Sequence, residues 1–249
     1  MFVRFLATAA IAASQFAISA TAAEATTPNL LIFSKTEGYR HKRHDSTIFT
    51  NGSLSDFSTL VFLSTTGNFL NASEADALDK FLLNGGSWLG IHAAGDFGDE
   101  FPAWYTKLVG GQFKSHPCVD DWMCTDAELE RYPPGGNIRP DIVTIQDATH
   151  PSTSGLPLSH NRTDEWYSYK TNVAENSNYT VLATLEETYI DENTLVEPQH
   201  MDPHPIAWYS LYEGKAKAFY TGMGHTNETY YEEYFIKHLT GGLEWVTSA

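Results

Sequence analysis

The sequence is short of cysteine. Only two of its 249 residues are cysteines, Cys118 and Cys124, which leaves room for a single disulfide. Five residues separate them, and in a secreted chain this spacing predicts a local disulfide that closes a small loop. A metal site made by the two cysteines and His116 is the alternative.

Basic residues are also scarce. Lysine and arginine together number 15 against 31 aspartates and glutamates, which gives a formal net charge of -16. A surface this acidic excludes nucleic acid and anionic membranes as partners, because both repel negative charge. Neutral sugars and polymers remain compatible with it.

Long apolar runs are missing beyond the first segment. Residues 1–4 carry one positive charge, residues 5–18 are small or apolar, and Ala20-Thr21-Ala22 offers a small-x-small cleavage site. This pattern predicts a secretory signal peptide over residues 1–22, since the apolar run is too short to span a membrane. We therefore expect a secreted, soluble protein with a single domain over residues 23–249.

Five Asn-x-Ser/Thr sequons accompany the predicted signal peptide. A polar chain of this size generates a couple by chance, so five favour N-glycosylation and a eukaryotic secretory route, fungal or other. The acceptor residues are Asn51, Asn71, Asn161, Asn178 and Asn227.

The most informative stretch is residues 85–96, GGSWLGIHAAGD. Its apolar run stops at His92, and three small residues and Asp96 follow. A buried strand that turns sharply through small residues into a helix is typical of a nucleophile elbow, in which the residue at the tip is lifted out of the sheet. The tip residue here is His92, and imidazole is better suited to metal ligation or acid/base chemistry than to covalent attack.

The N-terminal half alternates strands and helices. Residues 29–34 and 59–65 are predicted to form buried strands, and residues 73–83 a helix with Ser73 as N-cap and Asp76 three residues on. This alternation predicts a doubly wound α/β sheet. The site of such a sheet lies at the carboxyl ends of its strands, where the loops at 35–45, 65–68 and 92–96 would share one rim.

The C-terminal half reads as strands closed by a helix. Strands are predicted at 141–146, 165–169 and 179–185, a hairpin at 205–212 and 215–221 around Glu213-Gly214, and a helix at 232–239 with Phe235, Ile236 and Leu239 on one face. Residues 121–139 are predicted to be an insertion. The hairpin would bring His204 to the same end as His225.

Histidine is plentiful, with ten in the chain, and six lie in loops predicted near strand ends. A lone loop histidine is usually a hydrogen-bonded structural residue, but several on one rim suit a divalent metal. No two of them stand in an HxxxH pattern on a helix. The candidate ligands are His41, His44, His92, His204 and His225. His116 and His150 each precede a proline and are expected to make hydrogen bonds instead.

An ordered set of short motifs then resembles a known family. The motifs KTEGYRH, GIH, LVGGQFKSHP, THPSTSGLP, DEWYSY, HPIAWY and GMGHT occur in that order between residues 29 and 246 and resemble the ThuA-like proteins. These are named for trehalose utilisation and are related to class I glutamine amidotransferases. The resemblance implies a three-layer, flavodoxin-like doubly wound sheet with an antiparallel hairpin near the C-terminus.

The resemblance also implies site residues. The amidotransferase elbow carries a cysteine where this chain has His92, while His225 and Glu228 fall near the late His/Glu positions. Without a thiol at the elbow, glutamine hydrolysis through a thioester is excluded. The family's first loop runs GFRH followed closely by serine, whereas this chain has GYRHKRHDS, so either His41 or His44 is the family position; His41 directly follows Gly-Tyr-Arg.

These arguments assign two sets of roles. The expected catalytic residues are His92, His225, Glu228 and Asp96, although Glu228 equally suits a helix N-terminus. The residues expected to bind substrate are Glu37, Tyr39, Arg40, Asp164, Glu165 and Trp166. Carboxylates bind paired hydroxyls and indole packs on a sugar face, but a core tryptophan is as probable for Trp166.

Two classes of function follow. The first is a secreted enzyme that acts on a glycoside or keto-sugar, as a small molecule or polysaccharide, through a histidine-lined cleft. That cleft would hold zinc, copper or another divalent metal, or act as acid and base, and no nucleotide is implied. The second is a carbohydrate- or metal-binding protein without turnover. The sequence leaves the oligomeric state open.

Overall fold

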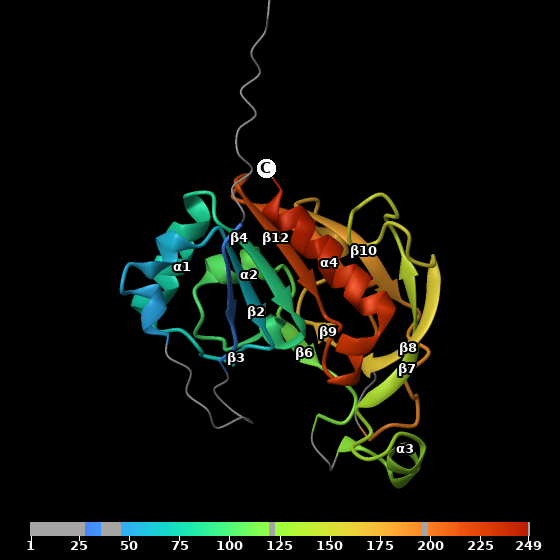
Figure 1. The fold of residues 1–249 in the computed structure, drawn as a ribbon. Helices are drawn as coiled ribbons and strands as arrows, with labels where there is room; N and C mark the ends of the chain where they lie inside the picture. The colour runs from blue at the N-terminus through green and yellow to red at the C-terminus, as the bar shows by residue number, and fades with distance from the viewer. Residues whose placement is uncertain (1–27, 36–45, 120–122, 196–198, 249) are drawn as a thin grey trace, which may run out of the picture.

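Eight strands pair in one mixed sheet in the order β1-β2-β4-β12-β11-β10-β7-β8 (Figure 1). The computed structural model describes residues 28–35, 46–119, 123–195 and 199–248. The strands in this order are Leu30–Phe33, Thr59–Leu63, Ser87–Ile91, Ala216–Thr221, His204–Tyr212, Tyr179–Leu185, Ile138–Ile145 and Ser159–Glu165.

The sheet has a parallel and an antiparallel half. β1, β2, β4 and β12 run parallel, whereas β12, β11, β10, β7 and β8 pair antiparallel. The predicted α/β fold class is therefore confirmed, and the antiparallel part of the sheet extends beyond the expected hairpin.

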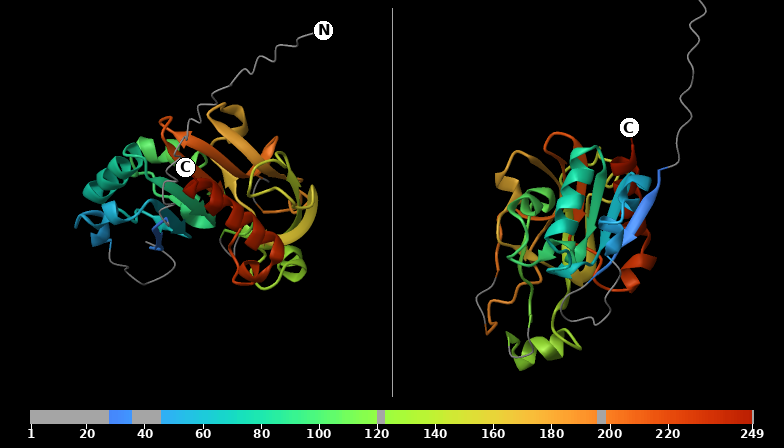
Figure 2. Two further views of the ribbon diagram at one scale, coloured as in Figure 1. Left: turned by 45° about the horizontal axis from the view of Figure 1, so that its top comes forward. Right: turned by 90° about the vertical axis from the view of Figure 1, so that its left-hand side faces the viewer.

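Helices cover both faces of the sheet (Figure 2). α1 (Ala72–Leu83) and α2 (Ala103–Val109) pack on one face, and α4 (Glu233–Thr247) packs on the other. In the fully buried strand β4, Trp88 belongs to the first core and its neighbour Leu89 to the second. A strand covered on both faces is apolar throughout, which is why this run was readable from the sequence.

The remaining elements are short. Two small sheets form, β3 (Thr66–Gly67) with β5 (Asp96–Phe97) and β6 (Phe113–Ser115) with β9 (Ser168–Tyr169). The β3–β5 pair confirms that the loops after β2 and β4 share one rim. Single turns and short helices complete the fold: η1 Thr47–Phe49, η2 Ser53–Asp56, η3 His92–Gly95, α3 Asp126–Arg131, η5 Val173–Glu175 and η6 Glu228–Tyr231.

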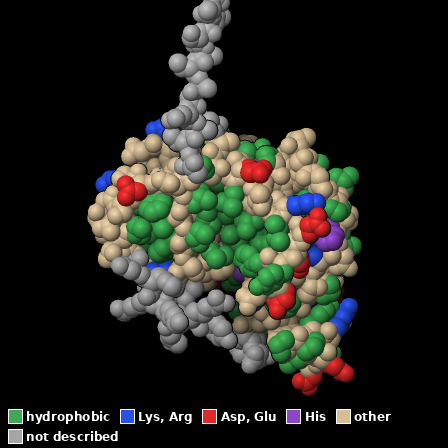
Figure 3. Space-filling view, in the orientation of Figure 1, with side chains coloured by type: hydrophobic (Ala, Val, Ile, Leu, Met, Phe, Trp, Pro, Cys, Tyr) green, Lys and Arg blue, Asp and Glu red, His purple; other side chains and the backbone are tan. Residues whose placement is uncertain are grey.

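Strand β1 is not covered on both faces as predicted. It is the edge of the sheet, and Leu30 and Ile32 are 40% and 66% exposed. Figure 3 shows hydrophobic side chains gathered on this side of the molecule. A four-residue apolar run cannot by itself distinguish an edge strand from a central one.

Three other predictions need correction. Helix α1 begins one residue earlier, with Asn71 as N-cap and Glu74 completing the capping box, so Ser73 and Asp76 do not cap it. Helix α4 runs to Thr247, and Ile236 is 47% exposed because it lies off the buried face. Strand β8 was not predicted, because its sequence SHNRTDE is polar.

Among the described residues, no helix is both long and apolar enough to cross a membrane.

Candidate functional site: a histidine–carboxylate cluster

His92 lies at the tip of a tight turn after β4, as the elbow pattern predicts. Its φ of 49° is left-handed, which is uncommon for a residue with a Cβ and marks a constrained backbone. The Tyr220 hydroxyl donates to the His92 carbonyl at 2.7 Å. A Cβ at Gly95 would lie 2.6 Å from that hydroxyl, so the turn requires glycine there.

His225 reaches the same place from the loop after β12. Its loop is held by Asp164, whose carboxylate accepts the backbone N–H groups of Gly224 at 2.9 Å and of His225 at 3.1 Å. The His225 side chain is 38% exposed, so the cluster has one open side.

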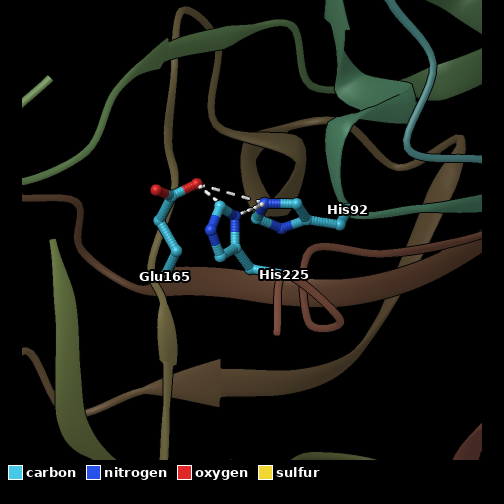
Figure 4. A group of neighbouring side chains, drawn as sticks. All are labelled: His92, Glu165 and His225. Carbon is cyan, nitrogen blue, oxygen red and sulfur yellow. Dashed lines mark hydrogen bonds and ion pairs between the residues drawn. The ribbon is translucent and has the colours of Figure 1, made fainter. Parts of the chain in front are cut away.

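Glu165 comes from the end of β8 and completes the cluster (Figure 4). His92 Nε2 lies 3.1 Å from Glu165 Oε2 and 3.0 Å from His225 Nδ1, and His225 Nδ1 lies 3.0 Å from Glu165 Oε2. The three atoms form a nearly equilateral triangle, a spacing at which all three can bind one metal ion.

The second nitrogen of His92 fixes its tautomer. Nδ1 lies 2.8 Å from the Gly222 carbonyl, and because a carbonyl only accepts, Nδ1 carries the proton. In a neutral ring the Nε2 lone pair then points into the cluster. A backbone carbonyl behind one ring nitrogen is the usual support of a metal-ligating histidine.

The cluster favours a charged carboxylate. Burial opposes it, but the hydrogen bond from His225, and that from His92 Nε2 when the His92 ring is protonated, hold the pKa of Glu165 well below its usual range. For His92, burial disfavours the charged form, yet the hydrogen bond to Glu165 and the nearby negative charges raise its pKa overall. The site therefore stabilises positive charge beside Glu165.

Asp96 lies at the rim of the cluster. Burial and the negative charge of Glu165 raise its pKa, against the opposing effect of His116 and His92. No side-chain hydrogen bond of Asp96 occurs among the described residues. A half-buried carboxyl with a raised pKa and no partner suits proton transfer.

Three neighbours of the cluster were not predicted as parts of the site. His116 Nε2 lies 3.4 Å from Glu165 Oε1, Asn137 donates to the same oxygen, and the Tyr167 ring lies 4.3 Å from that of His92. His116 also makes the expected hydrogen-bonding contact, at 2.9 Å from the Pro117 carbonyl. Tyr167 stands in the motif DEWYSY, which was the available signal, whereas Asn137 lies in the predicted insertion.

Two residues expected near the cluster lie elsewhere. His204 is buried with its ring nitrogens bonded to Glu187 and to the Tyr167 carbonyl, so it is not a ligand beside His225. Glu228 is exposed in η6, and Glu165 supplies the carboxylate that had been expected from it.

Two residues expected to bind sugar are inaccessible. Asp164 and Trp166 are each 0% exposed. The Asp164 carboxylate is occupied by backbone N–H groups, and Trp166 Nε1 donates to the Arg139 carbonyl. Trp166 is therefore a core residue and Asp164 supports the His225 loop.

Five predicted residues lie outside the described residues, so the structure gives no placement for Glu37, Tyr39, Arg40, His41 and His44.

The disulfide between Cys118 and Cys124 is present, as predicted. It lies over the buried Arg139, whose Nη2 contacts Cys118 Sγ at 3.4 Å and pairs with Glu128 at 2.9 Å. Arg139 thereby ties the disulfide loop to strand β7.

The profile of the ThuA family, described as trehalose utilisation, matches residues 23–246. The chain belongs to the ThuA family. Solved structures agree on the fold. A ThuA-like protein from Bacteroides uniformis superposes with a TM-score of 0.67 at 20% identity, covering 91% of this chain and 94% of its own. One from Parabacteroides merdae superposes with a TM-score of 0.59 at 16% identity, covering 89% and 90%.

No curated protein matches the chain. The description of the ThuA family supports a carbohydrate-related role.

Proposed function

We propose that the chain is a secreted, metal-dependent enzyme of the ThuA family that acts on a glycoside or keto-sugar. The single observation that carries this proposal is the triangle of His92 Nε2, His225 Nδ1 and Glu165 Oε2, with edges of 3.0–3.1 Å. The family description supports a carbohydrate as the substrate.

The triangle suits a divalent cation. An ion about 2.1 Å from each of three atoms spaced in this way sees them at angles close to 90°, as on one face of an octahedron. Two imidazoles and a carboxylate on one face leave other positions open to substrate or water. Zinc, copper or another first-row ion fits this donor set.

The proposed division of labour follows from the contacts. His92, His225 and Glu165 would hold the cation, which would supply polarisation of a sugar oxygen or of a water molecule. Asp96, which is half-buried and has no side-chain hydrogen bond to the described part of the chain, exchanges a proton with the substrate. Clustered imidazoles with an acid of raised pKa favour an enzyme over a binding protein that lacks turnover.

Metal binding is tested by calorimetry and thermal melting. Chelator-treated protein titrated with Zn²⁺, Mn²⁺ and Cu²⁺ should bind one ion, and EDTA should lower the melting temperature of the loaded protein because a bound ion stabilises the native state. His92→Ala and Glu165→Gln should lose that ion. His200→Ala is the matched control, since His200 also contacts carboxylates, Glu187 and Glu192, outside the cluster.

Turnover separates the enzyme from the binding protein. Metal-loaded protein should convert glycosides or keto-sugar glycosides, measured as the release of reducing sugar, and His92→Ala should abolish turnover with the fold intact. Unchanged melting with EDTA, together with no bound ion, contradicts the metal site. Saturable sugar binding without turnover would favour the binding protein.

A further inference from the structure

A cavity of about 360 Å³ lies beside the cluster, on the far side of His116. Its volume is at the lower end of the range for small-molecule pockets. Most of the wall is apolar, from Pro117, Val119, Met123 and Ile190, together with Tyr189.

The charges in this wall balance. Arg139 and Glu128 pair at 2.9 Å and are both buried, while Lys114 and Asp191 add one charge of each sign. A wall without net charge favours a neutral occupant. A phosphate or a metal ion would lose its hydration there without gaining a net opposite charge.

Polar side chains interrupt the apolar surface of the wall. Ser168 and Thr194 carry hydroxyls and Gln199 carries an amide among the residues that line the cavity. An occupant that carries an oxygen can therefore form a hydrogen bond there.

His116 connects the cavity with the cluster. Its ring lines the cavity, and its Nε2 lies 3.4 Å from Glu165 Oε1. Ser168, three residues after Glu165 in the chain, also lines the cavity. A molecule held at Glu165 would therefore be separated from this cavity by His116.

We propose that this cavity binds the aromatic aglycone of a glycoside whose sugar lies at the His92–Glu165–His225 cluster. The assignment of the sugar to the cluster rests on the proposed function, whereas the preference of the cavity for a neutral aromatic ring rests on the wall alone.

Two substitutions at residues that line the cavity should fill it with a larger side chain. Val119→Trp and Thr194→Trp place an indole in the wall, and Val119 is 41% exposed, so the fold should tolerate the change. Leu211→Trp is the control, because Leu211 is 54% exposed and does not line the cavity.

The first probe is hydroquinone, which needs neither sugar nor metal. Saturation-transfer NMR should detect its binding to the native protein, to Leu211→Trp and to the metal-site variant His92→Ala. Val119→Trp and Thr194→Trp should lose it. Equal binding to all variants, or to none, overturns the proposal, and loss of metal in His92→Ala bears only on the proposed function.

The second probe compares glycosides by calorimetry. Phenyl glucopyranosides of both anomers should bind on the order of tenfold more tightly than the methyl glucopyranosides, from the burial of one ring. Filling the cavity should remove this difference. Equal affinities of the phenyl and methyl compounds contradict the proposal. So does a result in which trehalose, and not the phenyl compounds, binds more weakly once the cavity is filled.

Discussion

Asp164 shows how a residue that cannot touch substrate controls the site. Its buried carboxylate accepts the N–H groups of Gly224 and His225, contacts Arg162 at 3.3 Å, and belongs to the same strand as Glu165. It therefore fixes the distance between two of the three proposed ligands.

Asp164→Asn should weaken metal binding without removing a ligand. An amide accepts through one oxygen only, so one backbone N–H of the His225 loop loses its partner, and affinity should fall about 10- to 100-fold. Asp141→Asn is the matched control, since Asp141 is equally buried and accepts the N–H groups of Glu187 and Thr188 far from the cluster. Equal loss of affinity in both variants would contradict a specific role for Asp164.

Two buried histidines outside the site predict acid sensitivity. Burial lowers the pKa of His238 to about 3, helped by Arg162, and lowers that of His150 to about 4 despite Asp147. Because both folded pKa values lie below the unfolded value of about 6.5, their contribution is full above pH 6.5 and is lost as the pH falls towards 4. Because two histidines titrate, the free energy of unfolding should fall by several kcal/mol over this pH range.

Replacing one of them isolates this effect. His238→Asn keeps a donor for the Ser152 carbonyl, which lies 3.1 Å from His238 Nδ1, and removes the titration. Denaturant unfolding between pH 4 and 7 should show a shallower pH dependence than that of the native chain. An unchanged slope would mean that His238 is not buried as a neutral ring.

The residues of the site were only partly predictable. The turn into His92 and the small residues around His225 are local patterns, so both histidines could be found from the sequence. The carboxylate could not be placed, because Glu165 joins the two histidines through the pairing of β7 and β8, whereas Glu228 is only a sequence neighbour of His225. Asn137 and His116 likewise reach Glu165 only through the tertiary fold.

At the scale of elements, α4 depends on a close contact with the turn at residues 150–152. A Cβ on Gly241 would lie 2.1 Å from the Pro151 carbonyl oxygen, and this backbone cannot swing aside as a side chain could. The helix approaches the turn so closely because Gly241 has no side chain.

Gly241→Ala should therefore destabilise the protein by about 1–3 kcal/mol, although alanine is the better helix former. Thr240→Ala, at the exposed preceding position, should change the free energy of unfolding by no more than ~0.5 kcal/mol. Urea unfolding of both variants measures the difference. A Gly241→Ala protein as stable as the native one would show that α4 can move off the turn.

Elements were predicted best where the pattern is unambiguous. Strand β10 and the hairpin of β11 and β12 follow from apolar runs around Glu213-Gly214. Strand β8 was not predicted because its inner face carries charged residues in place of apolar ones. Arg162 pairs with Asp164 and with Glu232. Its burial comes from an ion-pair network, which leaves no hydrophobic periodicity to detect.

For the whole molecule, the five sequons support the proposed secretory route. The five acceptor asparagines were identified from the sequence alone, and the structure shows that all of them are exposed: Asn51, Asn71, Asn161, Asn178 and Asn227. Among the described residues, the side chains of Asn51 and Asn71 form hydrogen bonds through Oδ1 alone, which leaves the nitrogen for a glycan.

Expression through a eukaryotic secretory pathway should therefore give a glycoprotein in the medium. Endoglycosidase treatment should lower its mass, and Asn→Gln changes at the five positions should each remove one step of that decrease. Retention inside the cell without glycans would contradict the secreted assignment and would leave the metal site untouched.

One cation held between three side chains from distant parts of the chain is the central proposal. The most direct measurement is an anomalous difference map from crystals of the loaded protein, recorded on both sides of the absorption edge of the metal. We predict a single strong peak about 2.0–2.3 Å from His92 Nε2, His225 Nδ1 and a Glu165 carboxylate oxygen. A fully loaded crystal without a peak there, or with its only peak elsewhere, would contradict the account.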